Sequence, residues 1–185
     1  MVESGYRMRN VVAGLAISLD GVVERPSAWS RFDAEMGAMI TEGLAGADAV
    51  LIGTSTYREF CEIWPGQPDS VAMAAFLNAA PKYVVTSTLT EFPWRNSSRL
   101  EGDLRGGVER LRAMPGGDIL VPGSPRLVRS LLGLGLLDRL NLMIHPVVVG
   151  SGLRLFDGLA GLRLALRDVR HLRASGAVAL AYGRE

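Results

Sequence analysis

Apolar and polar positions change period repeatedly along the chain. Short apolar runs rich in β-branched residues, each closed by turn signals, predict buried strands over 9–17, 48–53, 82–88 and 118–121. Apolar residues at helical spacing predict helices over 32–44, 55–64, 71–80, 103–114 and 125–135. Ser55 or Thr54 is the N-cap that we expect for the second of these helices.

Beyond residue 135 the alternation stops, and three strand-like pieces follow at 137–150, 162–172 and 177–185. Ser175-Gly176 separates the last two, which predicts an antiparallel hairpin at one edge of the sheet. The earlier strand–helix units predict parallel strands covered by helices, because parallel neighbours need crossover connections. The sequence therefore predicts one α/β domain with a mostly parallel sheet.

Composition excludes several classes of protein. Apolar residues make up 48% and charged residues 21% of the 185 residues, with a net charge of +1 and no basic run, so we expect no nucleic-acid partner. Cys61 is the only cysteine, and His145 and His171 lie far apart, so we expect no metal site. No segment has the length of a membrane span or the character of a signal peptide, and a cytoplasmic location is the expectation.

Small and hydroxylated residues follow three of the predicted central strands: 53–56, 86–88 and 122–124. Ligands of open α/β sheets bind outside the carboxyl ends of the strands, and a helix N-terminus with a glycine before it can seat a phosphate. Each turn alone is more often a plain connection between a strand and a helix. Together they predict a seat for a dinucleotide, although no GxGxxG or Walker A sequence is present.

Four motifs in order carry a family resemblance: SLDG (18–21), ADAVLIGTSTY (47–57), LVPGSPRLVRSLL (120–132) and LDRLNLMIHPVVVGSGLRLF (137–156). With them the chain resembles the dihydrofolate reductase superfamily, and most closely the reductase domain of the bacterial riboflavin-biosynthesis deaminase/reductase. The resemblance covers about Arg9 to Tyr182, so we expect residues 1–185 to form a single domain. It implies a three-layer fold with about eight strands and flanking helices.

The same resemblance implies an NADPH-dependent reductase of a heterocyclic substrate, similar to 5-amino-6-(5-phosphoribosylamino)uracil reductase and to dihydrofolate reductase. The implied cofactor-binding residues are those of the three turns: Gly53, Thr54, Ser55, Thr56, Thr86, Ser87, Thr88, Gly123 and Ser124. Thr54 stands where dihydrofolate reductases usually carry a cation that binds the 2′-phosphate, so NADH is not excluded as the cofactor.

Reduction of a C=N or C=O bond also needs a proton, which a carboxyl group or its bound water can supply if its pKa is raised. Asp20, beside the implied nicotinamide site, is the candidate catalytic residue; an Asp-Gly turn explains it equally well. Trp29, Asp33, Glu35 and Met36 are the candidate substrate-binding residues. Asp33 is alternatively a charge in the first helical turn, Glu35 a solvated residue, and Met36 part of a core stripe.

His145 precedes Pro146 in an apolar strand, and we expect it to be a packed residue. The long apolar strand around it favours a homodimer, since unpaired strand edges invite pairing. The missing cation at Thr54 leaves a second hypothesis open, namely a non-catalytic protein that binds a small molecule and retains the fold.

Overall fold

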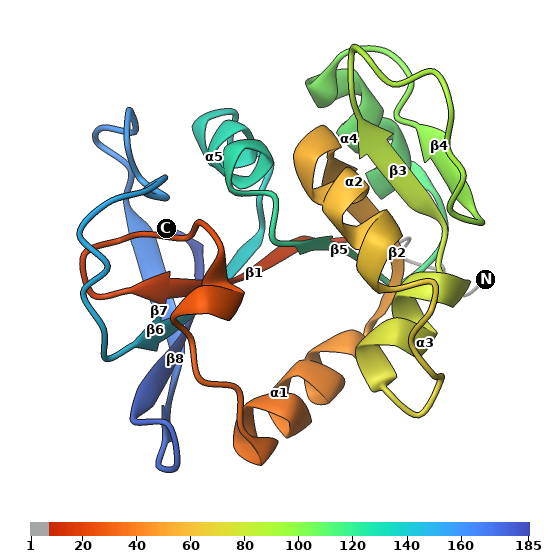
Figure 1. The fold of residues 1–185 in the computed structure, drawn as a ribbon. Coiled ribbons are helices and arrows are strands. Elements are labelled where there is room, and N and C mark those ends of the chain that lie inside the picture. The colour runs from red at the N-terminus through yellow and green to blue at the C-terminus, as the bar shows by residue number, and fades with distance from the viewer. Residues whose placement is uncertain (1–7) are drawn as a thin grey trace, which may run out of the picture.

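The strands form one eight-stranded sheet in the order β4-β3-β2-β5-β1-β6-β8-β7 (Figure 1). This computed structural model describes residues 8–185. Only β8 runs antiparallel to its neighbours, β6 and β7, which confirms the mostly parallel sheet and the C-terminal hairpin. The strands are β1 (Val11–Ser18), β2 (Ala47–Gly53), β3 (Lys82–Val85), β4 (Ser97–Arg99), β5 (Asp118–Pro122), β6 (Arg139–His145), β7 (Leu164–Leu172) and β8 (Ala177–Arg184).

Helices cover both faces of the sheet, which makes three layers. The helices are α1 (Ala34–Leu44), α2 (Thr54–Ile63), α3 (Ala72–Ala79), α4 (Leu104–Ala113) and α5 (Pro125–Gly133), with a 3-10 turn η1 (Pro26–Ala28). Buried side chains of α4 and α5 pack on one face, and those of α1, α2 and α3 pack on the other. The predicted helices are confirmed.

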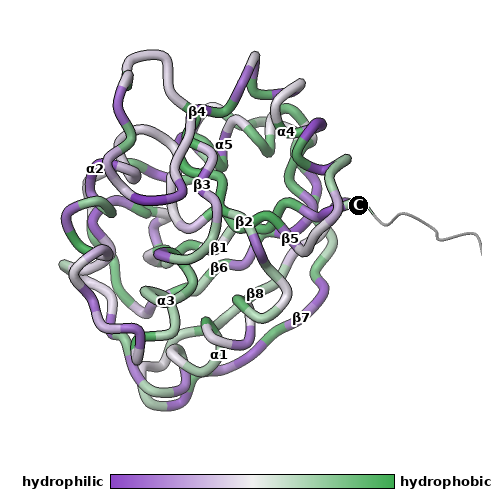
Figure 2. Tube along the Cα trace, turned by 90° about the vertical axis from the view of Figure 1, so that its right-hand side faces the viewer, coloured by the Kyte–Doolittle hydropathy of each residue, from purple (hydrophilic) through white to green (hydrophobic). Residues whose placement is uncertain are grey.

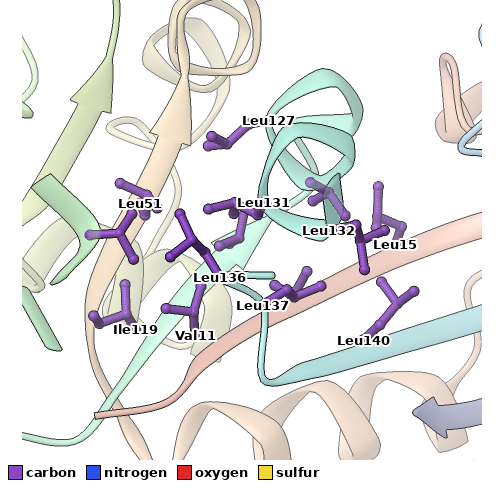
Figure 3. Close-up of a cluster of buried hydrophobic side chains, with 14 of the residues drawn as sticks. Val11, Leu15, Leu51, Ile119, Leu127, Leu131, Leu132, Leu136, Leu137 and Leu140 are labelled. Carbon is purple, nitrogen blue, oxygen red and sulfur yellow. The ribbon is translucent and has the colours of Figure 1, made fainter. Parts of the chain in front are cut away.

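The larger core lies between α5 and the sheet. Alternate residues of β1, among them Val11 and Leu15, point to this face because side chains of a strand alternate between faces. Leu127, Leu131 and Leu132 share the facing side of α5, and Figure 3 shows Leu132 beside Leu15 of β1, with Leu127 and Leu131 on the side of Leu51 of β2. Leu131 is fully buried, so its replacement by alanine is expected to cost about 2–5 kcal/mol of stability.

The opposite face of the sheet is filled unevenly. Tyr57 of α2 and Leu77 of α3 pack on Ile52 and Val84 over β2 and β3. Over β1 the same face carries Gly14 and Ala16, which fill little space. The small residues leave room between the centre of the sheet and α1.

Three local expectations were wrong or incomplete. Gly53, not Ser55 or Thr54, is the N-cap of α2, and Thr54 Oγ1 instead donates to the carbonyl of Val85 at 3.2 Å. The short strand β4 has the sequence SSR, with no apolar residue to signal it. The turn η1 buries no residue, so no hydrophobic pattern marks it either.

The sheet edges are β4 and β7, whereas β6 is paired on both sides. The expected homodimer was argued from an unpaired apolar strand around His145, and that argument is wrong because β1 and β8 flank this strand. Figure 2 shows polar positions recurring along β7, and between them Leu166 and Val169 are 52% and 53% exposed. The dimer itself stays a prediction.

Candidate functional site

The turns that follow the central strands lie side by side. Gly53 N–H at the end of β2 donates to Ser124 Oγ at 3.0 Å, and Gly123 N–H donates to the Gly14 carbonyl of β1 at 3.2 Å. The Thr54–Val85 bond joins the end of β3 to the same group. The carboxyl ends of β2, β3 and β5 therefore form one continuous rim, which lies beside Gly14 in the middle of β1.

The third turn has an unusual backbone. Gly123 and Ser124 both have left-handed φ angles, +73° and +57°. A serine rarely adopts this conformation, which costs of order 1 kcal/mol or more and needs support from its surroundings. Here Ser124 is buried and its hydroxyl accepts the Gly53 bond, so the neighbouring turn fixes the strained residue. The arrangement directs the start of α5 toward the rim.

The helices differ in whether a side chain caps their N-termini. The N-termini of α1 and α4 are capped by the carboxylates of Asp33 and Asp103. The N-termini of α2, α3 and α5 have no side-chain cap. The first residues of all three uncapped helices line one cleft. Their N–H groups and the positive ends of the helix dipoles are thus available to an anion.

The cleft has a volume of about 1640 Å³ and continues from the rim along the sheet beneath α1. Its floor includes Gly14 and Ala16 of β1 and Met143 of β6, and Met39 and Ile40 of α1 form part of the opposite wall. A Cβ atom built on Gly14 meets no atom within 4 Å, so the floor is open at that point. The volume exceeds the roughly 300–1,000 Å³ of an ordinary ligand pocket and is sufficient for a nucleotide beside a second molecule.

Six of the nine predicted cofactor-binding residues line this cleft: Gly53, Thr54, Ser55, Thr56, Gly123 and Ser124. The other three, Thr86, Ser87 and Thr88, do not line it. They follow β3, whose last residue, Val85, still lines the cleft. Thr86 Oγ1 accepts from the N–H groups of Thr88 and Leu89 and so serves its own turn.

Asp20 holds two segments of the chain together. Its carboxylate accepts from the Ser18 hydroxyl at 2.7 Å and from the N–H groups of Val149 and Gly150 at 3.0 and 2.9 Å. These bonds, led by that of Ser18, lower the pKa of Asp20 from 3.8 to about 2. The condition on which Asp20 was expected to supply a proton, a raised pKa, is therefore not met. Its geometry is that of a clamp between SLDG and the 147–154 loop.

The predicted substrate residues lie beside the cleft but not in its wall. Asp33 is the N-cap of α1, and the Met36 N–H, its main partner, lowers the pKa of this carboxyl. Met36 is fully buried against Leu172 and Ala177, so the core alternative holds for this residue. Glu35 is exposed and accepts from Ala174 N–H at 3.3 Å.

Trp29 contacts the ring of His145 edge-on, with 5.8 Å between ring centroids. Its indole N–H donates to the Glu24 carbonyl at 2.8 Å. The aromatic residues that do line the cleft include Phe32, which is 61% exposed, and Trp64, whose buried Nε1 has no partner.

Arg126 is a site residue that the sequence reasoning missed. It is exposed in the first turn of α5 and lines the cleft next to Ser124. Arg58 of α2, the cation nearest to Thr54 in the sequence, is exposed and lies outside the cleft wall. The signal for Arg126 was its place directly after the Gly-Ser-Pro turn, but this signal is weak because the chain has 20 arginines and lysines in all.

Metal and membrane chemistry find no support in the described part of the chain. Within residues 8–185, no three or more His, Cys, Asp and Glu side chains come together as metal ligands. Over the same residues, no helix has the length and apolar character to cross a bilayer.

Comparisons with known proteins agree with this fold. A family model described as the RibD C-terminal domain matches residues 9–180. The uncharacterized protein YyaP of Bacillus subtilis (strain 168) is 28% identical over 188 residues, which cover 98% of both chains. A putative riboflavin biosynthesis protein from Shewanella sp. PV-4 has a similar structure, with a TM-score of 0.76, 18% identity, and coverage of 95% of this chain and 99% of that one.

A second similar structure is longer. The deaminase/5-amino-6-(5-phosphoribosylamino)uracil reductase from Thermotoga maritima superposes with a TM-score of 0.67 and 16% identity. The match covers 96% of this chain and 57% of that one.

Proposed function

The chain belongs to the RibD C-terminal domain family, and from that premise we propose that it is an NADPH-dependent reductase of a heterocyclic substrate. The fold is dihydrofolate-reductase-like, as the four motifs predicted. The observation that carries the proposal is the convergence of the turns at Gly53 and Gly123, tied by the Gly53–Ser124 bond, at the mouth of the cleft.

The residues present fit a dinucleotide. Gly53 and Gly123 have no Cβ, so backbone N–H groups at the starts of α2 and α5 are open to a diphosphate. Arg126 adds a cation at the same rim, which supports NADPH as the cofactor. When bound, the reduced nicotinamide supplies a hydride, and the protein orients the rings and excludes water.

The second candidate function, a non-catalytic binder, has one specific observation in its favour. Hydrogen bonds lower the pKa of Asp20, the acid from which a proton was expected, and they also lower the pKa of Asp33. A protein that transfers no proton needs no acid. We favour the reductase because a bound water can be the proton source, and because the rim retains its anion seat.

Titration of the purified protein with NADPH and with NADH, followed by tryptophan emission, tests the proposal. We expect saturable binding, tighter for NADPH than for NADH. Gly53→Ala is the matching variant, because a Cβ there lies 3.6 Å from Ser124 and strains nothing, yet narrows the seat. Absence of a saturable response to either nucleotide contradicts the reductase and leaves the binder.

We also propose a homodimer, with the exposed apolar residues of β7, Leu166 and Val169, as its contact. A charge introduced at this contact by Val169→Glu is expected to give a monomer in sedimentation, and a wild-type protein that is monomeric at micromolar concentration contradicts the proposal. The cytoplasmic location stays a prediction.

A further inference from the structure

The cleft continues past the rim to the start of β6 and the middle of β7, and its lining changes along the way. Beneath α1 it is largely apolar, with Ile40 of α1 on one side and Met143 of β6 on the other. Three arginines then line it, Arg139 of β6 with Arg167 and Arg170 of β7. We call the part of the cleft that these three residues line the arginine end.

The carboxylates that line the cleft around the arginine end already have partners. Glu42 of α1 and Asp168 of β7 both pair with Arg170, at 2.7 and 3.0 Å, so the charge of this arginine is compensated. Asp118 of β5 accepts from the side-chain amide of Asn10 at 2.9 Å. In the part of the chain that the structure describes, the other two arginines of this end form no ion pair with any carboxylate.

A glycine and a break in the strand register place Arg139 and Arg167 side by side. Arg139 stands opposite Gly183 in the pairing of β6 with β8, and a Cβ atom built on Gly183 lies 2.9 Å from Nε of Arg167. The register of β7 shifts between Leu166 and Asp168, and an extra residue of this kind re-aims its side chain, here that of Arg167 into the cleft. Two neighbouring like charges without a carboxylate are unfavourable, and an anion bound between them removes this repulsion.

Asn141 adds a neutral polar group beside the two arginines. It lies two residues after Arg139, about 7 Å along the strand, and shares its face because alternate residues of a strand point the same way. Its register partners are Gly14 of β1 and Ala181 of β8, whose small size leaves the floor open on both sides. Among residues 8–185, the Asn141 amide has no hydrogen-bond partner in the neighbouring side-chain bonds of Asn10, Arg167 and Arg170.

We propose that the arginine end binds the oxyanion of an amphipathic anion, a ligand with a terminal phosphate or carboxylate and an apolar body that lies beneath α1. Guanidinium groups match the oxygens of phosphate and carboxylate in both geometry and charge. Arg167 uses one N–H on the Arg184 carbonyl, at 2.9 Å, and a guanidinium has further donors for a ligand. The apolar walls at Ile40 and Met143 accommodate the body. This inference does not depend on the reductase function.

Calorimetric titrations of the full chain at constant ionic strength test the proposal. Phenyl phosphate and phenylacetate each combine an apolar ring with one kind of oxyanion. Benzyl alcohol has the ring without the charge, and inorganic phosphate has the charge without the ring. We expect at least one of the ring-bearing anions to bind about 10-fold or more tightly than both references, because hydrogen bonds to a charged group and burial of the ring each add affinity.

Three variants and a control locate the anion. Arg139→Gln and Arg167→Gln are each expected to weaken the ring-bearing anion about 10-fold and to leave benzyl alcohol unchanged. Gly183→Ala retains every charge but displaces Arg167, since its Cβ lies 2.9 Å from Nε, and is expected to weaken the anion as well. Arg173→Gln removes the same charge from an exposed position outside the cleft wall, and we expect it to bind the anion as the wild type does.

Arg126→Gln distinguishes the arginine end from the rim, which also attracts phosphate. A loss in this variant that is absent in Arg139→Gln and Arg167→Gln places the anion at the rim and overturns the proposal. Equal losses in Arg173→Gln and Arg139→Gln also overturn it, because the general surface charge is then decisive, and so do anions that bind no more tightly than benzyl alcohol. Losses in both arginine variants and in Gly183→Ala, with Arg173→Gln unchanged, confirm the site whether or not NADPH binds.

Discussion

A side chain introduced at Gly14, in the floor of the cleft, is expected to weaken NADPH binding without destabilising the fold. Gly14 lies in β1, and its carbonyl accepts from Gly123 N–H, so a side chain at this position stands beside the third turn of the rim. Its Cβ meets no atom within 4 Å and its φ angle is not left-handed. Gly14→Val is therefore accommodated by the empty protein.

The magnitudes follow from that geometry. Glycine inside a strand is roughly 0.5–1 kcal/mol less stable than alanine, and β-branched residues favour strands, so the free energy of unfolding is expected to rise by up to about 1 kcal/mol. A ligand that must share the floor with the valine methyl groups meets an overpacking cost of about 1–3 kcal/mol. At 1.4 kcal/mol for each factor of ten, the NADPH affinity falls up to about 100-fold.

Urea denaturation and NADPH titration on the same preparation measure both quantities. Gly66→Val is the matched control, because Gly66 has equally open surroundings but lies in the loop after α2, outside the cleft wall. The control is expected to bind NADPH as the wild type does. If Gly14→Val is stable and still binds NADPH with wild-type affinity, the nucleotide does not lie over β1 and the placement of the rim is wrong.

Three further predictions concern single side chains. Arg126→Gln is expected to weaken NADPH about 10-fold and NADH less, since the cation serves an extra phosphate; equal losses contradict this assignment. Asp20→Asn is expected to lower the urea midpoint at pH 7. Because the folded pKa is about 2 and the usual value is 3.8, the clamp's stabilisation is present above pH 3.8 and lost as pH falls toward 2, so the two midpoints converge there. Burial lowers the pKa of Lys82 from 10.5 to about 8, so between pH 8 and pH 10.5 the unfolded chain binds more protons than the folded one and the free energy of unfolding rises with pH. In Lys82→Met this rise is expected to vanish. Denaturation of both proteins at pH 7 and pH 9.5 measures it.

The order of helices and strands was predictable because the spacing of apolar residues within each segment indicates whether it is a helix or a strand. The apolar stripe of α5, for example, appears in the sequence as Leu127, Val128, Leu131 and Leu132, and all four are buried. The strand β4 was not predictable, because SSR pairs with β3 only through backbone bonds, such as Lys82 N–H to the Asn96 carbonyl. A strand at the edge of a sheet that pairs only through its backbone does not require particular side chains, so the sequence gives no signal for it.

The rim was predictable in outline, whereas the substrate end was not. Glycine and hydroxylated residues after buried strands are a local signal, and the parallel sheet brings such ends together. Met36 was expected at the pocket, but helical spacing alone does not say which side of α1 faces the core and which faces the cleft. The contact with Leu172 and Ala177, more than 130 residues away, decides it.

Asp20 shows why a shared motif can mislead about chemistry. SLDG and the HPVVVGSGLRLF segment are far apart in the sequence, and the resemblance associated only the first with the ligand. The structure joins them to each other: Asp20 accepts from Val149 and Gly150, and Arg154 donates to the Asp20 carbonyl at 3.0 Å. The Asp20 carboxylate accepts from three groups, the Ser18 hydroxyl and two N–H groups of the loop, and so holds the loop against the SLDG turn whatever the substrate.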